Sequence, residues 1–320
     1  MINQKSIDQK SIDQNSSQSL ISTIQQLSEQ LEQLSRVVQH QLVPQLGANP
    51  MRINSEVLDQ AIAFRWEHPN HHPTGYFVAV KKPHLSRFDE LCNIDKQLEK
   101  VRQNTRAFVR GFYANNALLT GARGTGKSSI VKACLNEFHA EGLRVIELEK
   151  QYLNDLPTIV NEIADRAERF IIFCDDLAFE EGDTTYAGLK TVLDGSLSTT
   201  ADNVLIYATS NRKHLVTEKN RDNLEFNQSE NGEIRPGDSI EQKVSLADRF
   251  GLQIHFYTFS QDEYLAAVHL WLSEFGWRDD EIQAVRQLAI QYATQKGNRS
   301  GRVAMQFAKT QAGQRLLAQQ

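Results

Sequence analysis

Short apolar runs alternate with helical stretches between residues 116 and 257. Most of the runs contain consecutive apolar residues instead of a strict alternation with polar ones, which is typical of strands that are covered on both faces of a parallel sheet. The candidate strands are residues 117–120, 143–148, 170–174, 204–209 and 253–257. This alternation predicts an α/β domain built on a parallel sheet, with bounds at about residues 81–258.

Beyond the last apolar run the pattern becomes helical. Ser260 and Glu263 have the spacing of a capping box, which predicts a helix that begins there and ends near residue 275. Two more helical segments follow, at residues 279–296 and from residue 300 to the end. We therefore expect a small helical domain over residues 259–320.

The N-terminal part carries a polar repeat and then a helical stripe. Residues 1–18 repeat the unit KSIDQ and are too poor in apolar groups to order, so we expect a disordered tail. Apolar residues at alternating spacings of four and three over residues 20–38 predict a helix that Pro44 ends. Such a stripe packs on its own domain or pairs in a short coiled coil, and the pattern leaves both open.

Residues 19–80 as a whole are expected to form a helical extension and a linker. A second helical pattern at residues 57–62 leads into a stretch rich in proline and histidine at residues 66–73, and a strand is expected at residues 76–80. His68, His71 and His72 are potential metal ligands, but no cysteine or carboxylate constellation accompanies them. An exposed loop is therefore the preferred interpretation.

Two further polar features lie inside the α/β region. Arg102, Arg106 and Arg110 recur every four residues and share one helix face, either solvated or facing a phosphate or a neighbouring subunit. The polar insertion at residues 217–245 is too long for an ordinary connection, so it is either mobile or functional.

Composition narrows the class of protein further. The 320 residues carry 35 Lys and Arg against 40 Asp and Glu, for a formal net charge of -5, which gives no argument for a dedicated nucleic-acid binder. The 3 Cys form no CxxC pair, which favours a reducing compartment. No apolar run approaches the roughly 18 residues of a membrane span, and no signal-peptide pattern opens the chain. We expect a soluble, cytoplasmic protein.

The chemistry begins at the sequence GARGTGKS, which matches the P-loop pattern GxxxxGK[ST] between a predicted strand and a predicted helix. Glycines let backbone N–H groups turn toward phosphate oxygens, and the helix N-terminus adds positive potential. Lys127 is expected to reach the β- and γ-phosphates, and the Ser128 hydroxyl to bind Mg²⁺. The predicted nucleotide-binding residues are Gly121, Ala122, Arg123, Gly124, Thr125, Gly126, Lys127, Ser128 and Ser129.

An apolar strand that ends in two acids supplies the second half of the predicted site. Asp175, in the position of a Walker B acid, is expected to hold Mg²⁺ together with Ser128. Asp176 is expected to act as general base toward the attacking water. Cys174 is interpreted as a small core residue.

With these motifs in place, the sequence from about residue 88 to residue 307 resembles the AAA+ ATPases. Asn211 matches sensor 1, the residue that in the family orients the water, and Arg249 in SLADRFG resembles the family's arginine finger. Arg302 resembles the sensor 2 arginine, with Arg299 as the second choice. Ile94, within residues 91–95, resembles the segment that contacts the adenine ring, which implies ATP as the nucleotide.

The resemblance implies an enzyme that hydrolyses ATP with Mg²⁺ at the interfaces of a homo-oligomer and remodels an unknown protein or nucleic acid. The expected fold is a P-loop NTPase sheet with a C-terminal helical lid. The layout is most similar to a bacterial AAA+ family catalogued only as a domain of unknown function.

One residue departs from the family pattern, because Asp176 stands where Glu is common. A loader-like or scaffold protein that is switched by ATP and turns over little is therefore the alternative function. A third possible function is that of a P-loop kinase acting on a small molecule. It is disfavoured because it leaves Asn211, Arg249 and Arg302 without joint roles.

Overall fold

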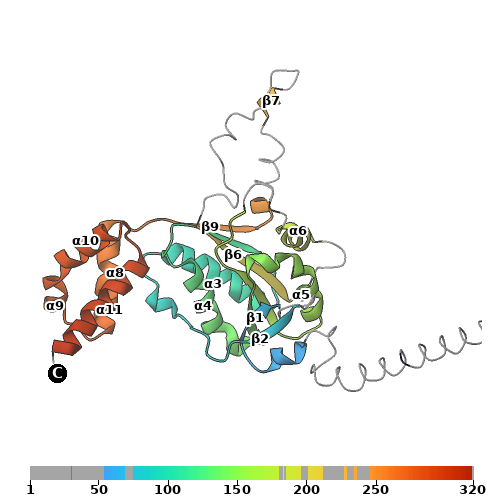
Figure 1. Ribbon diagram of the computed structural model, residues 1–320, viewed down its shortest axis with the longest axis horizontal. Coiled ribbons are helices and arrows are strands. Elements are labelled where there is room, and N and C mark those ends of the chain that lie inside the picture. The colour runs from blue at the N-terminus through green and yellow to red at the C-terminus, as the bar shows by residue number, and fades with distance from the viewer. Residues whose placement is uncertain are drawn as a thin grey trace, which may run out of the picture. The chain divides into compact units, whose positions relative to one another are not determined.

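The computed structural model describes residues 54–68, 75–179, 183, 185–195, 201–211, 227–228, 234–235 and 246–318, together with Gln30. The described residues from Asn54 onward belong to one of the two units into which the chain divides, and their helices and strands are labelled in Figure 1. The predicted tail at residues 1–18 and the predicted helical stripe at residues 20–38 lie outside the described residues, apart from Gln30. Within the 217–245 insertion, β7 (Asn227–Gln228) and β8 (Ile234–Arg235) form an antiparallel pair.

A seven-stranded sheet forms the centre of this unit, in the order β2-β1-β4-β5-β6-β3-β9. The predicted strands are confirmed as β3, β4, β5, β6 and β9, and these pair in parallel. Their bounds are β3 Ala117–Gly121, β4 Leu143–Glu147, β5 Arg169–Cys174, β6 Val204–Ser210 and β9 Leu252–Phe256. The α/β class with a mostly parallel sheet is confirmed.

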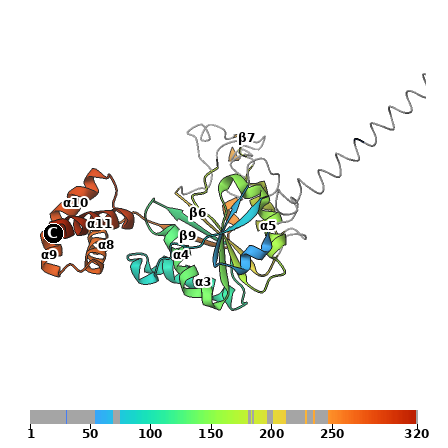
Figure 2. The same ribbon diagram turned by 60° about the horizontal axis from the view of Figure 1, so that its bottom comes forward.

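Helices cover both faces of the sheet because successive strand residues point to opposite sides. Leu119 packs in the cluster beneath α3 and α4, whereas Leu118 packs in the cluster beneath α5 and α6. Figure 2 shows α3 and α4 on one side of the sheet and α5 on the other. Cys174 is buried in the second cluster, as predicted, and burial raises its pKa to about 12. The helices are α3 (Asp95–Val109), α4 (Lys127–Phe138), α5 (Leu156–Ile163) and α6 (Ala187–Leu193).

The chain before residue 80 differs from the expected helix and linker. Residues 55–59 form only a short 3-10 helix, and β1 (Ala63–Glu67) and β2 (Tyr76–Ala79) form an antiparallel pair that extends the main sheet through β4. Phe64 and Trp66 are each 1% exposed while Arg65 between them is exposed, which is the alternation of a strand. The helix predicted at residues 57–62 is therefore wrong, because its apolar residues lead into a strand. The strand expected at residues 76–80 is confirmed as β2, and both β1 and β2, which precede the bound expected at residue 80, belong to the main sheet.

His68 follows β1 and has a packing role. Its Nε2 lies 2.6 Å from Asp155 Oδ2, and its ring stacks on Tyr152 with the centroids 4.7 Å apart. His71 and His72 lie outside the described residues. Among the residues that are described, no cluster of three His, Cys, Asp or Glu side chains suits a metal ion.

The arginine stripe on α3 joins α3 to α4. Arg102 Nε donates to Glu137 at 2.9 Å, and Arg106 contacts the same carboxylate at 3.5 Å. Arg110 lies 4.0 Å from Glu141, just beyond α4. These contacts agree with the interpretation of a partly solvated face and give the stripe a structural role.

Residues 261–318 form four helices, drawn in orange to red in Figure 1. The predicted capping box is confirmed, since Glu263 N–H donates to Ser260 Oγ and Ser260 N–H donates to Glu263 Oε2. The single helix expected at residues 279–296 is two helices, which meet at Val285. The bounds are α8 Gln261–Glu274, α9 Asp279–Ala284, α10 Arg286–Gln295 and α11 Gly301–Ala318.

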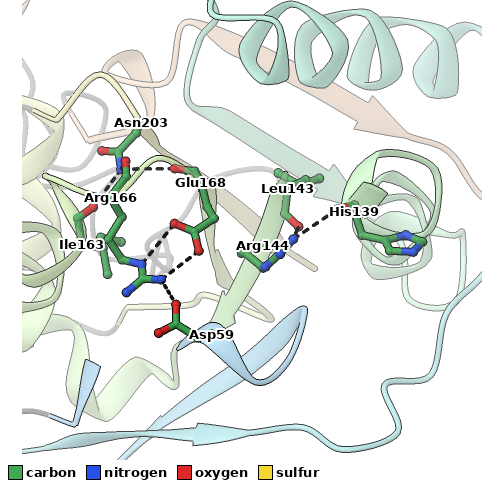
Figure 3. Close-up of polar contacts among 8 residues, drawn as sticks. All are labelled: Asp59, His139, Leu143, Arg144, Ile163, Arg166, Glu168 and Asn203. Atoms are coloured by element: carbon green, nitrogen blue, oxygen red, sulfur yellow. Dashed lines mark hydrogen bonds and ion pairs between the residues drawn. The ribbon is translucent and has the colours of Figure 1, made fainter. Parts of the chain in front are cut away.

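A polar network holds the loops at the amino ends of β4, β5 and β6 (Figure 3). Arg166 donates to Glu168 at 2.8 Å and also to Asp59. The Asn203 amide donates to the carbonyls of Ile163 and Arg166 at 2.8 and 3.1 Å. The network therefore closes the edge of the sheet opposite the one where ligands bind in parallel α/β folds.

This network predicts a pH dependence of stability. The hydrogen bond from Arg166 lowers the pKa of Glu168 below its ordinary value of 4.5. A carboxylate of lowered pKa stabilises the fold above its unfolded pKa, and the contribution is lost as the pH falls through the folded pKa. Glu168→Gln should lower the free energy of unfolding by about 1–2 kcal/mol at neutral pH, through the weakened bond to a charged group. Urea unfolding at a series of pH values measures this difference.

The difference between wild type and Glu168→Gln should shrink as the pH falls below about 4.5, where the carboxylate of the unfolded chain becomes protonated. Glu56→Gln, at an exposed position, is the control and should change stability by less than about 0.5 kcal/mol. A difference that stays constant down to about pH 3 would contradict the assigned pairing.

Candidate functional site

A pocket of about 560 Å³ lies where β3, β5 and β6 end. Its walls come from the loop after β3, the carboxyl ends of β5 and β6, residues 84–94, and α8 and α11. Ligands of parallel α/β sheets bind at the carboxyl ends of the strands, so the pocket has the expected place. Strand β6 lies between β3 and β5, which brings its last residues between the two Walker motifs.

The P-loop takes a bend that only glycine tolerates. Gly121 has φ 130° and Gly126 has φ 102°, both in the left-handed region. A Cβ on Gly121 would lie 2.0 Å from the Phe256 carbonyl oxygen, so β9 excludes any side chain there. Gly126 is the N-cap of α4, and the first backbone N–H groups of a helix have no partner within it. The loop therefore presents N–H donors and positive potential to an anion.

The predicted loop residues divide into two groups. Those from Arg123 to Ser129 line the pocket. Gly121 and Ala122 lie in the bend below, and their carbonyl oxygens accept hydrogen bonds from Lys127 at 2.8 and 2.7 Å. The Thr125 hydroxyl also donates to the Ala122 carbonyl, at 2.8 Å. The lysine therefore supports the loop from within.

Lys127 is 5% exposed and its ammonium group also donates to Asn211 Oδ1 at 3.0 Å. Burial lowers the pKa of Lys127, and the nearby Arg302 and Arg123 lower it further, while Asp175 and Asp176 oppose the shift. A bound polyphosphate would supply the negative charge that favours the protonated form. The group is therefore placed to bind phosphate oxygens by charge-assisted hydrogen bonds.

Ser128 and Asp175 form a pair of oxygen donors beside the P-loop. The Ser128 hydroxyl donates to Asp175 Oδ1 at 2.7 Å. Because its only proton lies on this bond, the lone pairs of the hydroxyl oxygen stay available for a cation. A hydroxyl and a carboxylate oxygen at this distance are the hard ligands that Mg²⁺ prefers. These two residues therefore fit the divalent cation predicted from the sequence.

Asp176 lies next to this pair with both carboxylate oxygens engaged. Asn211 Nδ2 donates to Asp176 Oδ1, and Arg123 lies 3.7 Å from Oδ2. The Asn211 amide thus bridges Lys127 and Asp176. Asp176 has φ 54°, which is rare outside glycine and best tolerated by Asp and Asn. The turn holds the second acid in a strained conformation that needs support from its neighbours.

Residues from the segment 91–94 form another wall of the pocket. Ile94 is 4% exposed and lines the pocket together with Leu91 and Cys92. A Cβ atom added to Gly126 would lie 2.9 Å from Ile94 Cδ1, so Ile94 packs directly on the P-loop. Asn93, at φ 63°, donates to the Glu263 carbonyl at 2.8 Å and ties this wall to α8.

Arg302, in the first turn of α11, lines the pocket, whereas Arg299 is not among the lining residues. The Arg302 backbone N–H donates to the Gly124 carbonyl at 3.3 Å. The Arg299 carbonyl accepts from the Phe259 N–H at 3.2 Å. Of the two candidates for sensor 2, the structure therefore places Arg302 beside the P-loop.

Arg249, like Gly121 and Ala122, is a predicted site residue that does not line the pocket. Its guanidinium donates to the carboxylate of Asp194, which caps the C-terminus of α6. An intrachain ion pair is the structural alternative to a role in a neighbouring subunit. The pairing is compatible with both, so the arginine finger stays a prediction.

Several residues of the pocket were not predicted from the sequence. Trp271 on α8 and Lys309 on α11 line it, and Lys309 follows Arg302 by two turns on one helix face. His84 and Ser86 lie in its wall. Thr209 also lines the pocket, and the signal was a polar residue at the end of an otherwise apolar strand.

A family model described as "Protein of unknown function (DUF815)" matches residues 59–315. No curated protein is significantly similar to this sequence. Among solved structures, the Thermotoga maritima RuvB Holliday junction branch migration motor is similar at 14% identity and a TM-score of 0.44. The match covers 68% of this chain and 60% of the RuvB chain. The FIGL-1 AAA domain in complex with ADP is similar at 13% identity and a TM-score of 0.46, covering 83% of this chain and 81% of that chain.

In the part of the chain that the structure describes, no helix combines the length and the apolar character needed to cross a bilayer.

Proposed function

The chain belongs to the protein family of unknown function DUF815, and from its own site we propose that it is an AAA+ ATPase that binds and hydrolyses ATP. One observation carries the proposal. A continuous chain of contacts runs from Lys127 through Asn211 and Asp176 to Arg123, beside the Ser128 and Asp175 pair. Phosphate-binding, cation-binding and water-activating groups thus meet in one pocket.

Nucleotide binding follows from the P-loop and its walls. The N–H groups at the start of α4 and the Lys127 ammonium bind the phosphates. Arg302 on α11 adds positive charge to the pocket. Because α8 and α11 both contribute to the pocket wall, the C-terminal helices act as a lid over the nucleotide. The apolar Ile94 and its neighbours receive the adenine ring.

Ser128 and Asp175 would hold Mg²⁺, which neutralises charge that develops on the phosphate oxygens during the reaction. In the hydrolysis itself, Asn211 orients the attacking water and Asp176 accepts its proton. As the water oxygen bonds to the γ-phosphorus, the bond from phosphorus to the bridging oxygen breaks and ADP leaves. General base catalysis of this kind is worth about 10²–10⁴ in rate.

A direct experiment tests the activity: release of inorganic phosphate from ATP in the presence of Mg²⁺, with an EDTA control. Phosphate that appears on an added metabolite instead of in solution would indicate a kinase. Binding of ATP without release of phosphate would indicate the second candidate.

That second candidate is a loader-like or scaffold protein that is switched by ATP. It is favoured by Asp176, whose carboxylate is one methylene shorter than the Glu that is common at this position. Under this alternative, the bound nucleotide controls contact with a protein or nucleic-acid partner and turnover is slow.

We propose further that hydrolysis takes place between subunits of a homo-oligomer, with Arg249 acting on the nucleotide of its neighbour. Arg249→Ala should lower the rate per subunit by about a thousandfold, because the transition-state charge loses its external cation. Binding of ATP should be retained, since Arg249 does not line its own pocket. Phosphate release and nucleotide titration measure the two effects.

Asp194→Asn separates this role from a structural one, since Asp194 is the intrachain partner of Arg249. If the ion pair alone matters, Asp194→Asn should reproduce the loss of activity. A mixture of the Arg249→Ala and Lys127→Ala variants provides the positive test. In a mixed oligomer some interfaces combine an intact P-loop with an intact Arg249, so the mixture should regain activity that neither variant has alone.

A further inference from the structure

Thr209 is a polar residue in the middle of the sheet, near the end of β6, and its side chain is 1% exposed. The five residues before it in the strand are apolar. A buried hydroxyl is costly unless it is hydrogen-bonded, so its partners show what it does. Thr209 forms hydrogen bonds with Asp175 and Asp176, the two acids of the site, and with Leu177, the residue that follows them.

The hydroxyl of Thr209 connects the two acids directly. Asp176 N–H donates to Thr209 Oγ1 at 2.8 Å, and Thr209 Oγ1 donates to Asp175 Oδ1 at 2.5 Å. The direction of each bond is determined, because a backbone N–H only donates and a hydroxyl has a single proton. The Thr209 carbonyl also accepts from the Leu177 N–H at 2.7 Å. One residue therefore holds three successive residues of the turn.

Each of these contacts supports a part of the site that is under strain or needs orientation. The bond to the Asp176 N–H stabilises a backbone at φ 54°, a conformation that costs about 1–3 kcal/mol in a residue other than glycine. The bond to Asp175 Oδ1 reaches the oxygen that also accepts from Ser128. The two hydroxyls together fix the rotation of the carboxylate.

We propose that Thr209 is a positioning residue that orients Asp175 for a divalent cation and holds Asp176 in place for the attacking water. This inference rests on the proposed function, because it assigns Thr209 a task in the same site. Thr209 acts through the two acids and not on the nucleotide. Hydrogen bonds to metal-ligating carboxylates commonly affect metal affinity by about 10–100-fold.

Thr209→Val tests the inference, because valine keeps the shape of threonine and removes the hydroxyl. The first readout is the affinity for ADP, by equilibrium dialysis, with and without Mg²⁺. Thr209→Val should weaken the Mg²⁺-dependent part of binding by about tenfold and leave binding in EDTA within about threefold of wild type. The rate of ATP hydrolysis at saturating Mg²⁺ should also fall by about tenfold, through the misplaced Asp176.

Two variants keep the test independent of folding. Thr209→Ser retains the hydroxyl and should restore Mg²⁺-dependent binding and hydrolysis. Thr105→Val removes another buried hydroxyl, which bonds to the Val101 carbonyl and lies near Tyr207 Oη in the core. It should lower thermal stability as much as Thr209→Val does without changing the effect of Mg²⁺.

The outcomes separate this inference from the proposed function. If Mg²⁺ strengthens ADP binding in wild type and equally in Thr209→Val, the role of Thr209 is wrong and the site remains. If Thr209→Ser is as impaired as Thr209→Val, the methyl group matters and not the hydroxyl, which also overturns the inference. If Mg²⁺ has no effect on wild type, the cation site itself fails, and the inference fails with it.

Discussion

Lys127→Ala should remove nucleotide binding, weakening it by about a hundredfold or more. The ammonium group lies 5% exposed in the pocket, and its charge-assisted hydrogen bonds to phosphate are worth about 1.5–3 kcal/mol each. The substitution also removes the bonds to the Gly121 and Ala122 carbonyls, so the shape of the loop is lost with the charge. Titration with a fluorescent ATP analogue measures the effect.

Lys132→Ala is the matched control, since Lys132 is an exposed lysine on the same helix. It removes one positive charge from α4 but none from the pocket, so binding should stay within about threefold of wild type. Equal loss in the two variants would mean that net charge drives binding. Unchanged binding in Lys127→Ala would exclude the P-loop as the nucleotide site.

Asp176→Asn should abolish turnover by about 10²–10⁴-fold while nucleotide binding is retained. Asparagine matches the size of aspartate and tolerates positive φ, so the turn at φ 54° stays intact. It still accepts a hydrogen bond from Asn211 but no longer takes a proton from water. Phosphate release and ATP titration on the same sample separate the two effects.

Asp262→Asn, an exposed carboxylate at the start of α8, is the control for the loss of one negative charge and should keep full activity. If Asp176→Asn hydrolyses ATP at the wild-type rate, Asp176 is not the base. If wild type hydrolyses ATP as slowly as Asp176→Asn does, the result supports the alternative function of an ATP-switched scaffold.

Much of the fold was predictable because its strands are buried on both faces. Strands β3, β5 and β6 contain continuous runs of buried apolar residues, and such runs differ clearly from the amphipathic helices between them. Strand β2 was predicted, but β1 and its pairing with β2 were missed, because the alternation of β1 spans only five residues beside a run of proline and histidine. Its partners lie at β4, about 80 residues away along the chain, and local pattern does not report such pairing.

The candidate site was predictable where a motif fixes the spacing of residues. The P-loop and the two acids follow strands directly, so their place at the sheet edge follows from the strand assignment. Thr209 has no motif, and its role depends on β6 lying beside β5, which only the strand order shows. The ion pair between Arg249 and Asp194 likewise depends on how α6 packs. The proposed role of Arg249 toward another subunit depends on contacts between two copies of the chain, which no pattern within one sequence reports.

The central claim is that ATP is hydrolysed at this pocket between subunits. The most direct measurement is the rate of phosphate release per subunit, with saturating ATP and Mg²⁺, over a wide range of protein concentration. If ATP is hydrolysed between subunits, the rate should rise with concentration as subunits assemble and then level off. A negligible rate at every concentration would contradict it and would make ATP a switch in place of a substrate.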